Sequence, residues 1–184
     1  MSSDGSAGSE RALPPGALAR AVAAIDAGLP YKDALEALLL ELAPPDADWL
    51  MQVLRESRGA FAPLARARAG RALFLGDPLS GTPVALGRLG FETTALARDP
   101  ERLAFAARRA RALAQVPSAF VRGGADARLP FADRAFDLVV QEGGLPGPAT
   151  GYAHDLAECA RVGGELVLVA DNRFGYKRSA GAHG

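Results

Sequence analysis

From Arg71 onward, short apolar runs alternate with longer stretches of helical periodicity, and this alternation constrains the fold more than any other feature of the sequence. Short apolar runs bounded by turn residues are typical of buried strands, and the amphipathic stretches between them are typical of helices that connect parallel strands. We expect strands at 72–75, 92–96, 119–121, 138–140 and 165–170, with helices at 82–89, 100–114 and about 152–160. The sequence therefore predicts an α/β domain over 70–184, with a Rossmann-like parallel sheet of about five strands flanked by helices.

The residues before this domain predict helices only. Apolar residues recur there at helical spacing, and the expected helices lie at about 18–28, 31–42, 46–54 and 61–69. Pro44-Pro45 is expected to end the second helix, and Asp46 or Asp48 is expected to cap the third. This helical segment, 13–69, would either pack over the domain at a substrate entrance or form a dimerisation surface, and the sequence leaves both open.

The composition excludes several classes of protein. Lysine and arginine total 21 against 21 aspartate and glutamate residues, so the overall charge gives no support for nucleic-acid binding. The single Cys159 excludes an internal disulfide and is expected to be a small buried thiol. Because the two histidines are far apart, no metal site is expected. The basic run Arg108, Arg109 and Arg111 is expected to be a solvated helix face.

No targeting or membrane segment is expected. No run approaches the roughly 18 consecutive apolar residues of a membrane span. Residues 1–12 begin Ser/Gly-rich and acidic, lack the basic and apolar regions of a signal peptide, and predict a disordered lead. We therefore expect a cytoplasmic protein.

Five stretches of the α/β domain follow one another in a recognisable order: Ala72–Gly76, Gly90–Leu96, Asp99–Leu103, Asp126–Val140 and Val162–Ala170. Together they resemble the class I S-adenosylmethionine (SAM) methyltransferases, over roughly 71–175. In that family the stretches correspond to the first strand with its glycine-rich loop, the second strand, the start of the next helix, the fourth strand with the loop before it, and the fifth strand with its Gly-Gly turn. The resemblance gives Asp137, at the start of the fourth strand, a structural role.

The resemblance implies that SAM binds at the carboxyl ends of the strands, with Gly76, Asp77, Ser80 and Gly81 in the loop after the first strand. Glycines in this loop let the backbone approach the ligand closely. Gly76 is retained, but Pro78 and Ser80 stand at the next two glycine positions. Proline lacks an N–H and carries a ring that glycine lacks, so the loop is an unusual one for the family.

The end of the second strand departs further from the family pattern. The family places an Asp or Glu there, which accepts hydrogen bonds from both ribose hydroxyls, and the aligned residue is Ala97. Hydrogen bonds to a charged group contribute roughly 1.5–3 kcal/mol each, so this loss weakens SAM binding on the order of ten- to a thousandfold. Asp99, two residues further on, either reaches the ribose or caps the helix that begins at Pro100.

The remaining site positions implied by the resemblance follow the third and fourth strands. Asp126 would lie near the adenine amino group with Ala127 beside it, unless Asp126 is a plain turn residue. Gln141 and Glu142 would face the sulfonium, and Glu142 is a weak candidate for a polar contact or a base. His154 is a second weak catalytic candidate, with a surface or capping role as its alternative.

The fifth strand stands close to the end of the sequence. Family members usually continue with a helix and an antiparallel pair of strands, and only fourteen residues follow Ala170. These C-terminal strands are therefore expected to be missing, which would leave unpaired N–H and C=O groups at the sheet edge. We expect the N-terminal helices, a second copy or a partner chain to cover that edge, and truncation of a longer gene product is another interpretation.

Two functions follow from these features. The first is a SAM-dependent methyltransferase with an unusual binding loop, supported by Gly76, Asp126 and the order of the five stretches. The second is a catalytically inactive subunit that stabilises or regulates a partner, supported by Pro78, Ser80 and Ala97. A dinucleotide-dependent oxidoreductase is weaker, because the loop has no G-x-G-x-x-G. The sequence does not specify a methyl acceptor, and we expect SAM binding to be weak or absent.

Overall fold

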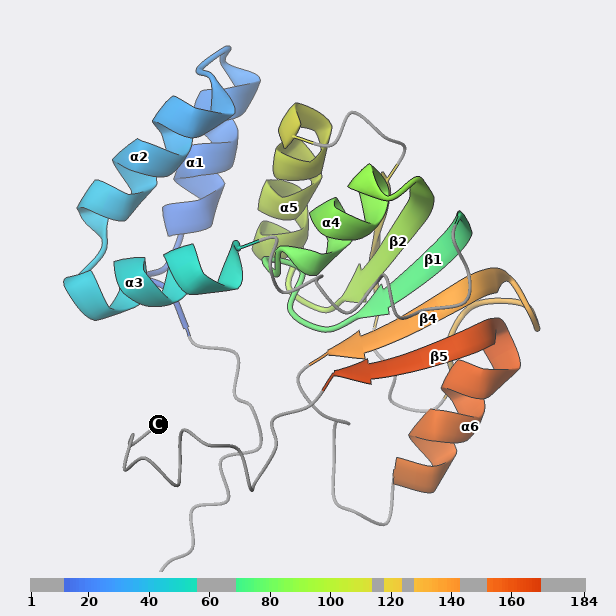
Figure 1. Cartoon of the computed structure of the whole chain (residues 1–184). Coiled ribbons are helices and arrows are strands. Elements are labelled where there is room, and N and C mark those ends of the chain that lie inside the picture. The colour runs from blue at the N-terminus through green and yellow to red at the C-terminus, as the bar shows by residue number, and fades with distance from the viewer. Residues whose placement is uncertain (1–11, 56–68, 114–117, 124–127, 143–151, 170–184) are drawn as a thin grey trace, which may run out of the picture.

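The computed structural model describes residues 12–55, 69–113, 118–123, 128–142 and 152–169. The expected fourth N-terminal helix and nearly all of the expected disordered lead lie outside these ranges. Three helices come first: α1 (Ala17–Asp26), α2 (Tyr31–Glu41) and α3 (Pro44–Val53). Strands and helices then follow in the order β1 (Gly70–Leu75), α4 (Thr82–Arg88), β2 (Phe91–Ala97), α5 (Pro100–Leu113), β3 (Ser118–Arg122), β4 (Phe136–Glu142), α6 (Tyr152–Val162) and β5 (Gly163–Val169) (Figure 1).

The five strands form one parallel sheet in the order β3-β2-β1-β4-β5. In its centre, Leu73 of β1 pairs with Val139 of β4. Parallel neighbours need crossover connections, and α4, α5 and α6 connect successive strands in this way. The predicted fold class is confirmed: a Rossmann-like parallel sheet flanked by helices follows an all-helical N-terminal segment.

Alternate residues of β1 build two separate cores, because successive side chains of a strand point to opposite faces. Ala72 and Phe74 pack with Leu86 of α4. Leu73 and Leu75 pack on the other face, in a cluster that includes Val162 of α6. The same cluster holds Cys159, so the prediction of a buried thiol is confirmed, and burial raises the pKa of that thiol to about 11.

The start of β4 is fixed to the start of β1 by Asp137. The backbone N–H of Arg71 donates a 2.8 Å hydrogen bond to Oδ2 of Asp137. Gly70 has a φ of 114°, and a Cβ at this position would collide with the same carboxylate. The structural role predicted for Asp137 is therefore confirmed, and Gly70 is the residue that leaves room for it.

Arg161 joins α6 to the segment before β4. Its guanidinium donates to the Leu129 carbonyl at 2.9 Å and pairs with Asp133 and Glu158 at 2.8 Å each. Glu158 also accepts a hydrogen bond from the backbone N–H of Leu129. The hydrogen bond from Arg161 is the main cause that holds the pKa of Glu158 down at about 2.

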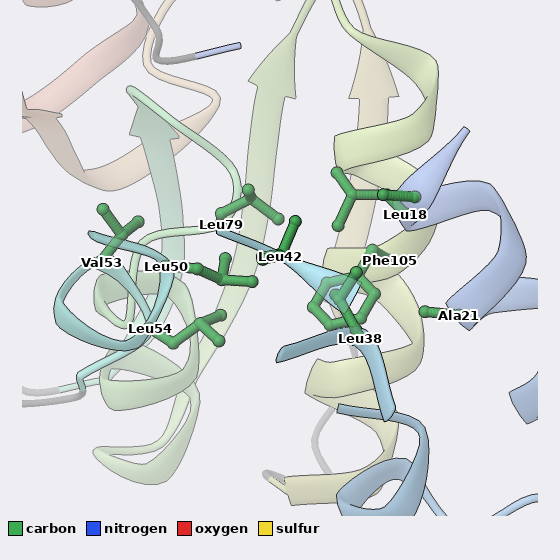
Figure 2. Packing of buried hydrophobic residues seen from close by; sticks show 10 residues of the cluster. Leu18, Ala21, Leu38, Leu42, Leu50, Val53, Leu54, Leu79 and Phe105 are labelled. Atoms are coloured by element: carbon green, nitrogen blue, oxygen red, sulfur yellow. The ribbon is translucent and has the colours of Figure 1, made fainter. Parts of the chain in front are cut away.

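The N-terminal helices form a third core with the α/β domain. Figure 2 shows Leu38, Leu42, Leu50, Val53 and Leu54 gathered around two residues of that domain, Leu79 and Phe105.

The expected boundary at Pro44-Pro45 was wrong in one respect. These prolines are the first residues of α3, whose N-cap is Ala43, and neither Asp46 nor Asp48 caps the helix. Proline is tolerated in the first helical turn because the N–H groups there have no partner within the helix.

Candidate functional site

The carboxyl ends of β1, β2 and β4 lie at one edge of the sheet, because the three strands are parallel neighbours. This edge brings together most of the residues singled out from the sequence. They are Gly76, Asp77, Ser80 and Gly81 after β1, Asp99 after β2, and Gln141 and Glu142 at the end of β4.

The loop after β1, residues 76–81 (the β1 loop), has a hydrogen-bonded conformation of its own. Oδ1 of Asp77 accepts a 3.0 Å hydrogen bond from the backbone N–H of Leu79, and the N–H of Ser80 donates to the Asp77 carbonyl at 2.9 Å. Oδ2 of Asp77 forms a 2.5 Å ion pair with Arg102 of α5, whose guanidinium carbon lies 5.5 Å from the ring centroid of Trp49. The Asp77–Arg102 ion pair thus joins the β1 loop to the first turn of α5.

Glu142 holds the other end of the β1 loop. Its Oε2 accepts hydrogen bonds from the hydroxyls of Ser80, at 2.8 Å, and Thr82, at 2.7 Å, and all three residues are buried. A Cβ on Gly76 would lie 3.1 Å from the Glu142 carbonyl oxygen and 2.9 Å from Cζ of Phe74. A side chain at position 76 would therefore crowd Phe74 and the end of β4, and the Glu142 carboxylate binds the loop.

The prediction that the basic run of α5 forms a solvated face is wrong for Arg109. Arg109 is only 3% exposed. Its guanidinium donates to the carbonyls of Leu79, at 3.0 Å, and Ser80, at 3.1 Å, and also to the carbonyl of Leu54 at the end of α3. Arg108 lies towards the surface instead, where it pairs with Asp26 of α1 at 2.8 Å.

The end of β2 carries no carboxylate, and the nearest one serves the following helix. Ala97 is the buried last residue of the strand, and its carbonyl accepts the N–H of Gly123. Oδ1 of Asp99 accepts the backbone N–H groups of Glu101, at 2.8 Å, and Arg102, at 3.2 Å. Asp99 therefore caps α5, as its place before Pro100 predicted.

A cavity of about 310 Å³ adjoins this end of β2. One wall is the start of α5, from Asp99 to Arg102, and the other is the stretch from Ala12 to Leu18 that leads into α1. Its volume is at the lower end of the range of about 300–1,000 Å³ that small-molecule sites occupy. Because Arg102 also pairs with Asp77, this one side chain links the cavity wall to the β1 loop.

The hydrogen bonds and ion pairs described above do not involve four of the predicted site residues. Asp126 and Ala127 lie outside the described residues. His154 is in the first turn of α6, and Gln141 is buried in β4, paired in register with Leu75 of β1. The sequence analysis missed Leu79, Thr82, Arg102 and Arg109. A signal for the two arginines was present, because residues seven apart in a helix share one face.

No group of three or more His, Cys, Asp or Glu residues that could hold a metal ion occurs within the described ranges. No helix in these ranges is both long and apolar enough to cross a membrane.

The strand order, the β1 loop and the site at the carboxyl edge define a Rossmann-like domain of the kind that binds ligands at the ends of its strands. Two solved structures that share this fold are described as SAM-dependent methyltransferases, and the fold of this chain is class I SAM-methyltransferase-like. Comparisons with protein-family models and with curated proteins gave no match.

Two solved structures carry this comparison. One is a putative SAM-dependent methyltransferase from Methanococcus maripaludis, with a TM-score of 0.55 and 17% identity over 76% of this chain and 63% of that one. The other is a SAM-dependent methyltransferase from Aquifex aeolicus, with a TM-score of 0.51 and 13% identity over 70% of this chain and 76% of that one. At these identities the likeness shows the fold, and this chain spans less than two thirds of the first neighbour.

Two positions at this edge bear on a nucleoside-bearing ligand such as SAM: Gly76 and the carboxylate after β2. At the end of β1, Phe74 and Glu142 fill the space that a side chain on Gly76 would take. A carboxylate is present beside the cavity at Asp99 rather than at position 97, where Ala97 stands. The site therefore offers a ribose hydroxyl one acid that already accepts two backbone N–H groups.

Proposed function

We propose that this chain binds SAM at the carboxyl ends of β1 and β2 and transfers its methyl group to an acceptor at the end of β4. The observation that carries the proposal is the sheet order β3-β2-β1-β4-β5, which brings the β1 loop, Asp99 and the end of β4 to one edge. In open α/β sheets, ligands bind outside the carboxyl ends of the strands, where the strand order reverses. Here that point lies between β1 and β4.

The chain's own residues would bind and orient the cofactor. The β1 loop would pass close to the amino-acid part of SAM at Gly76, and Asp99 would accept a hydrogen bond from a ribose hydroxyl. Asp126 and Ala127 would contact the adenine, as the family resemblance implies. Bound SAM supplies an electrophilic methyl group, and the main contribution of the protein is to hold an acceptor in line with it.

Glu142 has a positioning role in this proposal rather than the role of a base. Its carboxylate already accepts two hydroxyl hydrogen bonds from Ser80 and Thr82, and it is 6% exposed. These contacts set the end of the β1 loop against the end of β4, where Gln141 would face the sulfonium. His154, in the first turn of α6, is the catalytic candidate of this proposal.

We expect the affinity for SAM to be low. A carboxylate that accepts both ribose hydroxyls is missing at Ala97. Oδ1 of Asp99 already binds the N-terminus of α5, and its Oδ2 lies 3.4 Å from Nε of Arg102. At roughly 1.5–3 kcal/mol for each hydrogen bond to a charged group, the loss weakens binding on the order of ten- to a thousandfold.

Calorimetric titration with SAM, and with its demethylated product, tests the proposal. The sharpest variant is Asp99→Ser, because serine keeps the helix cap and removes the carboxylate, together with its 3.4 Å ion pair to Arg102. We expect both ligands to bind the wild-type chain weakly, and Asp99→Ser to weaken them further while the melting temperature stays nearly unchanged. Equal affinity of the two proteins would reject the role of Asp99.

Absence of any binding to the wild-type chain would favour the second candidate, a catalytically inactive subunit that stabilises or regulates a partner. Its supporting observations are the apolar Ala97 and the contacts of two carboxylates within the chain. Asp77 pairs with Arg102, and Glu142 accepts hydrogen bonds from Ser80 and Thr82.

A further inference from the structure

The β1 loop packs against α3, which belongs to the N-terminal helical segment. The side chain of Leu79 is fully buried, in the same cluster as Leu50, Val53 and Leu54 of the N-terminal segment (Figure 2). The backbone N–H of Gly81 donates a 2.9 Å hydrogen bond to the carbonyl of Val53, the last residue of α3. The loop thus packs against α3 through both side chain and backbone.

Arg109 connects the β1 loop to the end of α3 through its guanidinium. One nitrogen of its guanidinium donates to two successive loop carbonyls, Leu79 and Ser80, and the other donates to the carbonyl of Leu54. The planar guanidinium presents its donors in a fixed geometry, so it holds these carbonyls in a defined arrangement. Because Arg109 is buried, a change in the position of α3 would leave either this cation or the carbonyls without their hydrogen bonds.

We propose that Arg109 is a positioning residue that makes the conformation of the β1 loop depend on the docking of α3. This inference rests on the proposed function, which gives the β1 loop its role in holding SAM. The N-terminal helices then act on cofactor affinity through the loop, so that the helical segment and the SAM site form one cooperative unit.

Hydrogen–deuterium exchange of the full chain tests the coupling without SAM. The N–H groups of Leu79, Ser80, Gly81 and Thr82 are all hydrogen-bonded, to Asp77, Asp77, Val53 and Ser80 respectively, so their exchange reports opening of the loop. Arg109→Met should accelerate exchange of these amides about tenfold or more, together with those at the end of α3. The dissociation constant for SAM should rise by a similar factor.

Three further variants make the result specific. Leu50→Ala loosens the N-terminal cluster from the side of α3 and should accelerate the same loop amides, even if Arg109→Met does not fold. Arg108→Met removes only the neighbouring exposed pair with Asp26, and the loop amides should exchange as in the wild type. Val162→Ala creates a cavity in the core beneath α6, and should lower the melting temperature without a selective effect on the loop.

The proposal is overturned if Arg109→Met and Leu50→Ala accelerate loop exchange no more than Val162→Ala does at an equal loss of stability. It is also overturned if the loop opens in Arg109→Met while the end of α3 stays protected. If the wild-type chain binds no SAM, the proposed function fails, and the exchange pattern still decides whether the loop and α3 are coupled.

Discussion

The hydroxyl of Thr82 donates a 2.7 Å hydrogen bond to the carboxylate of Glu142, and this buried contact joins the first turn of α4 to the end of β4. Thr82→Val keeps the shape of the side chain and removes the donor. Loss of a buried hydrogen bond to a charged group should lower the free energy of unfolding by about 1–3 kcal/mol, measured by chemical denaturation. Thr93→Val is the control. Thr93 is equally buried, but its hydroxyl makes a long hydrogen bond of 3.5 Å to the carbonyl of Phe91. Equal losses in the two variants would contradict the role given to Glu142.

Gly70 and Gly90 offer a matched pair for the contact with Asp137. Both have positive φ, 114° and 96°, so alanine at either position should cost about 1–3 kcal/mol of backbone strain. A Cβ at Gly90 meets nothing within 4 Å, whereas a Cβ at Gly70 collides with Asp137. Thermal unfolding should therefore show a larger loss for Gly70→Ala. Because the excess arises from the collision, Asp137→Ala should abolish it in the double variant, and an excess that persists there would contradict this account.

The stability of the fold should depend on Glu158 at acid pH. The hydrogen bond from Arg161 lowers the pKa of Glu158 from 4.5 to about 2, so the folded state favours the ionised form. The resulting stabilisation is fully present above pH 4.5 and is lost as the pH falls towards 2. Glu158→Gln should therefore flatten the loss of stability between these values, as measured by urea denaturation at several pH values. Glu36→Gln, at an exposed position of α2, is the control. An unchanged acid profile in Glu158→Gln would show that the ion pair does not act in this way.

The outer edge of the sheet leads to a prediction about assembly. Within the described ranges, β5 pairs only with β4, and Leu168 of β5 is 48% exposed. Exposed strand edges present rows of N–H and C=O groups that pair readily with another chain. We propose that a second copy covers this edge, and light scattering of the purified chain should give a mass above the 19.0 kDa of one copy. A stable monomer at micromolar concentration would contradict this proposal.

The sequence predicted the sheet and its helices because hydrophobic periodicity is a local signal. The runs at 72–75 and 138–140 are apolar at every position, as expected for strands covered on both faces, and they pair in the centre of the sheet. The boundary at Pro44-Pro45 was wrong because proline is common both after the end of a helix and in the first turn of one. Here the extended backbone of Ala43 precedes the prolines, and they begin α3.

The contacts of the candidate site could not be predicted in the same way. Arg109 has the same local pattern as its partly exposed neighbour Arg108, and its burial depends on carbonyls that a distant loop and α3 bring to it. Leu79 stands in a loop with no periodicity to assign its direction, and its partners come from the N-terminal helices. Asp99 was placed correctly as a cap because capping depends only on the residues next to it.

Chemical-shift mapping with the ¹⁵N-labelled full chain tests the central claim most directly. The account predicts that added SAM shifts the amide signals of Gly76, Asp77 and the start of α5 at Asp99–Arg102. Signals from the opposite end of the sheet, at Arg71 and Asp137, should stay in place. Saturating SAM that leaves the first group unmoved, or that shifts both ends alike, would contradict a SAM site at the carboxyl ends of β1 and β2.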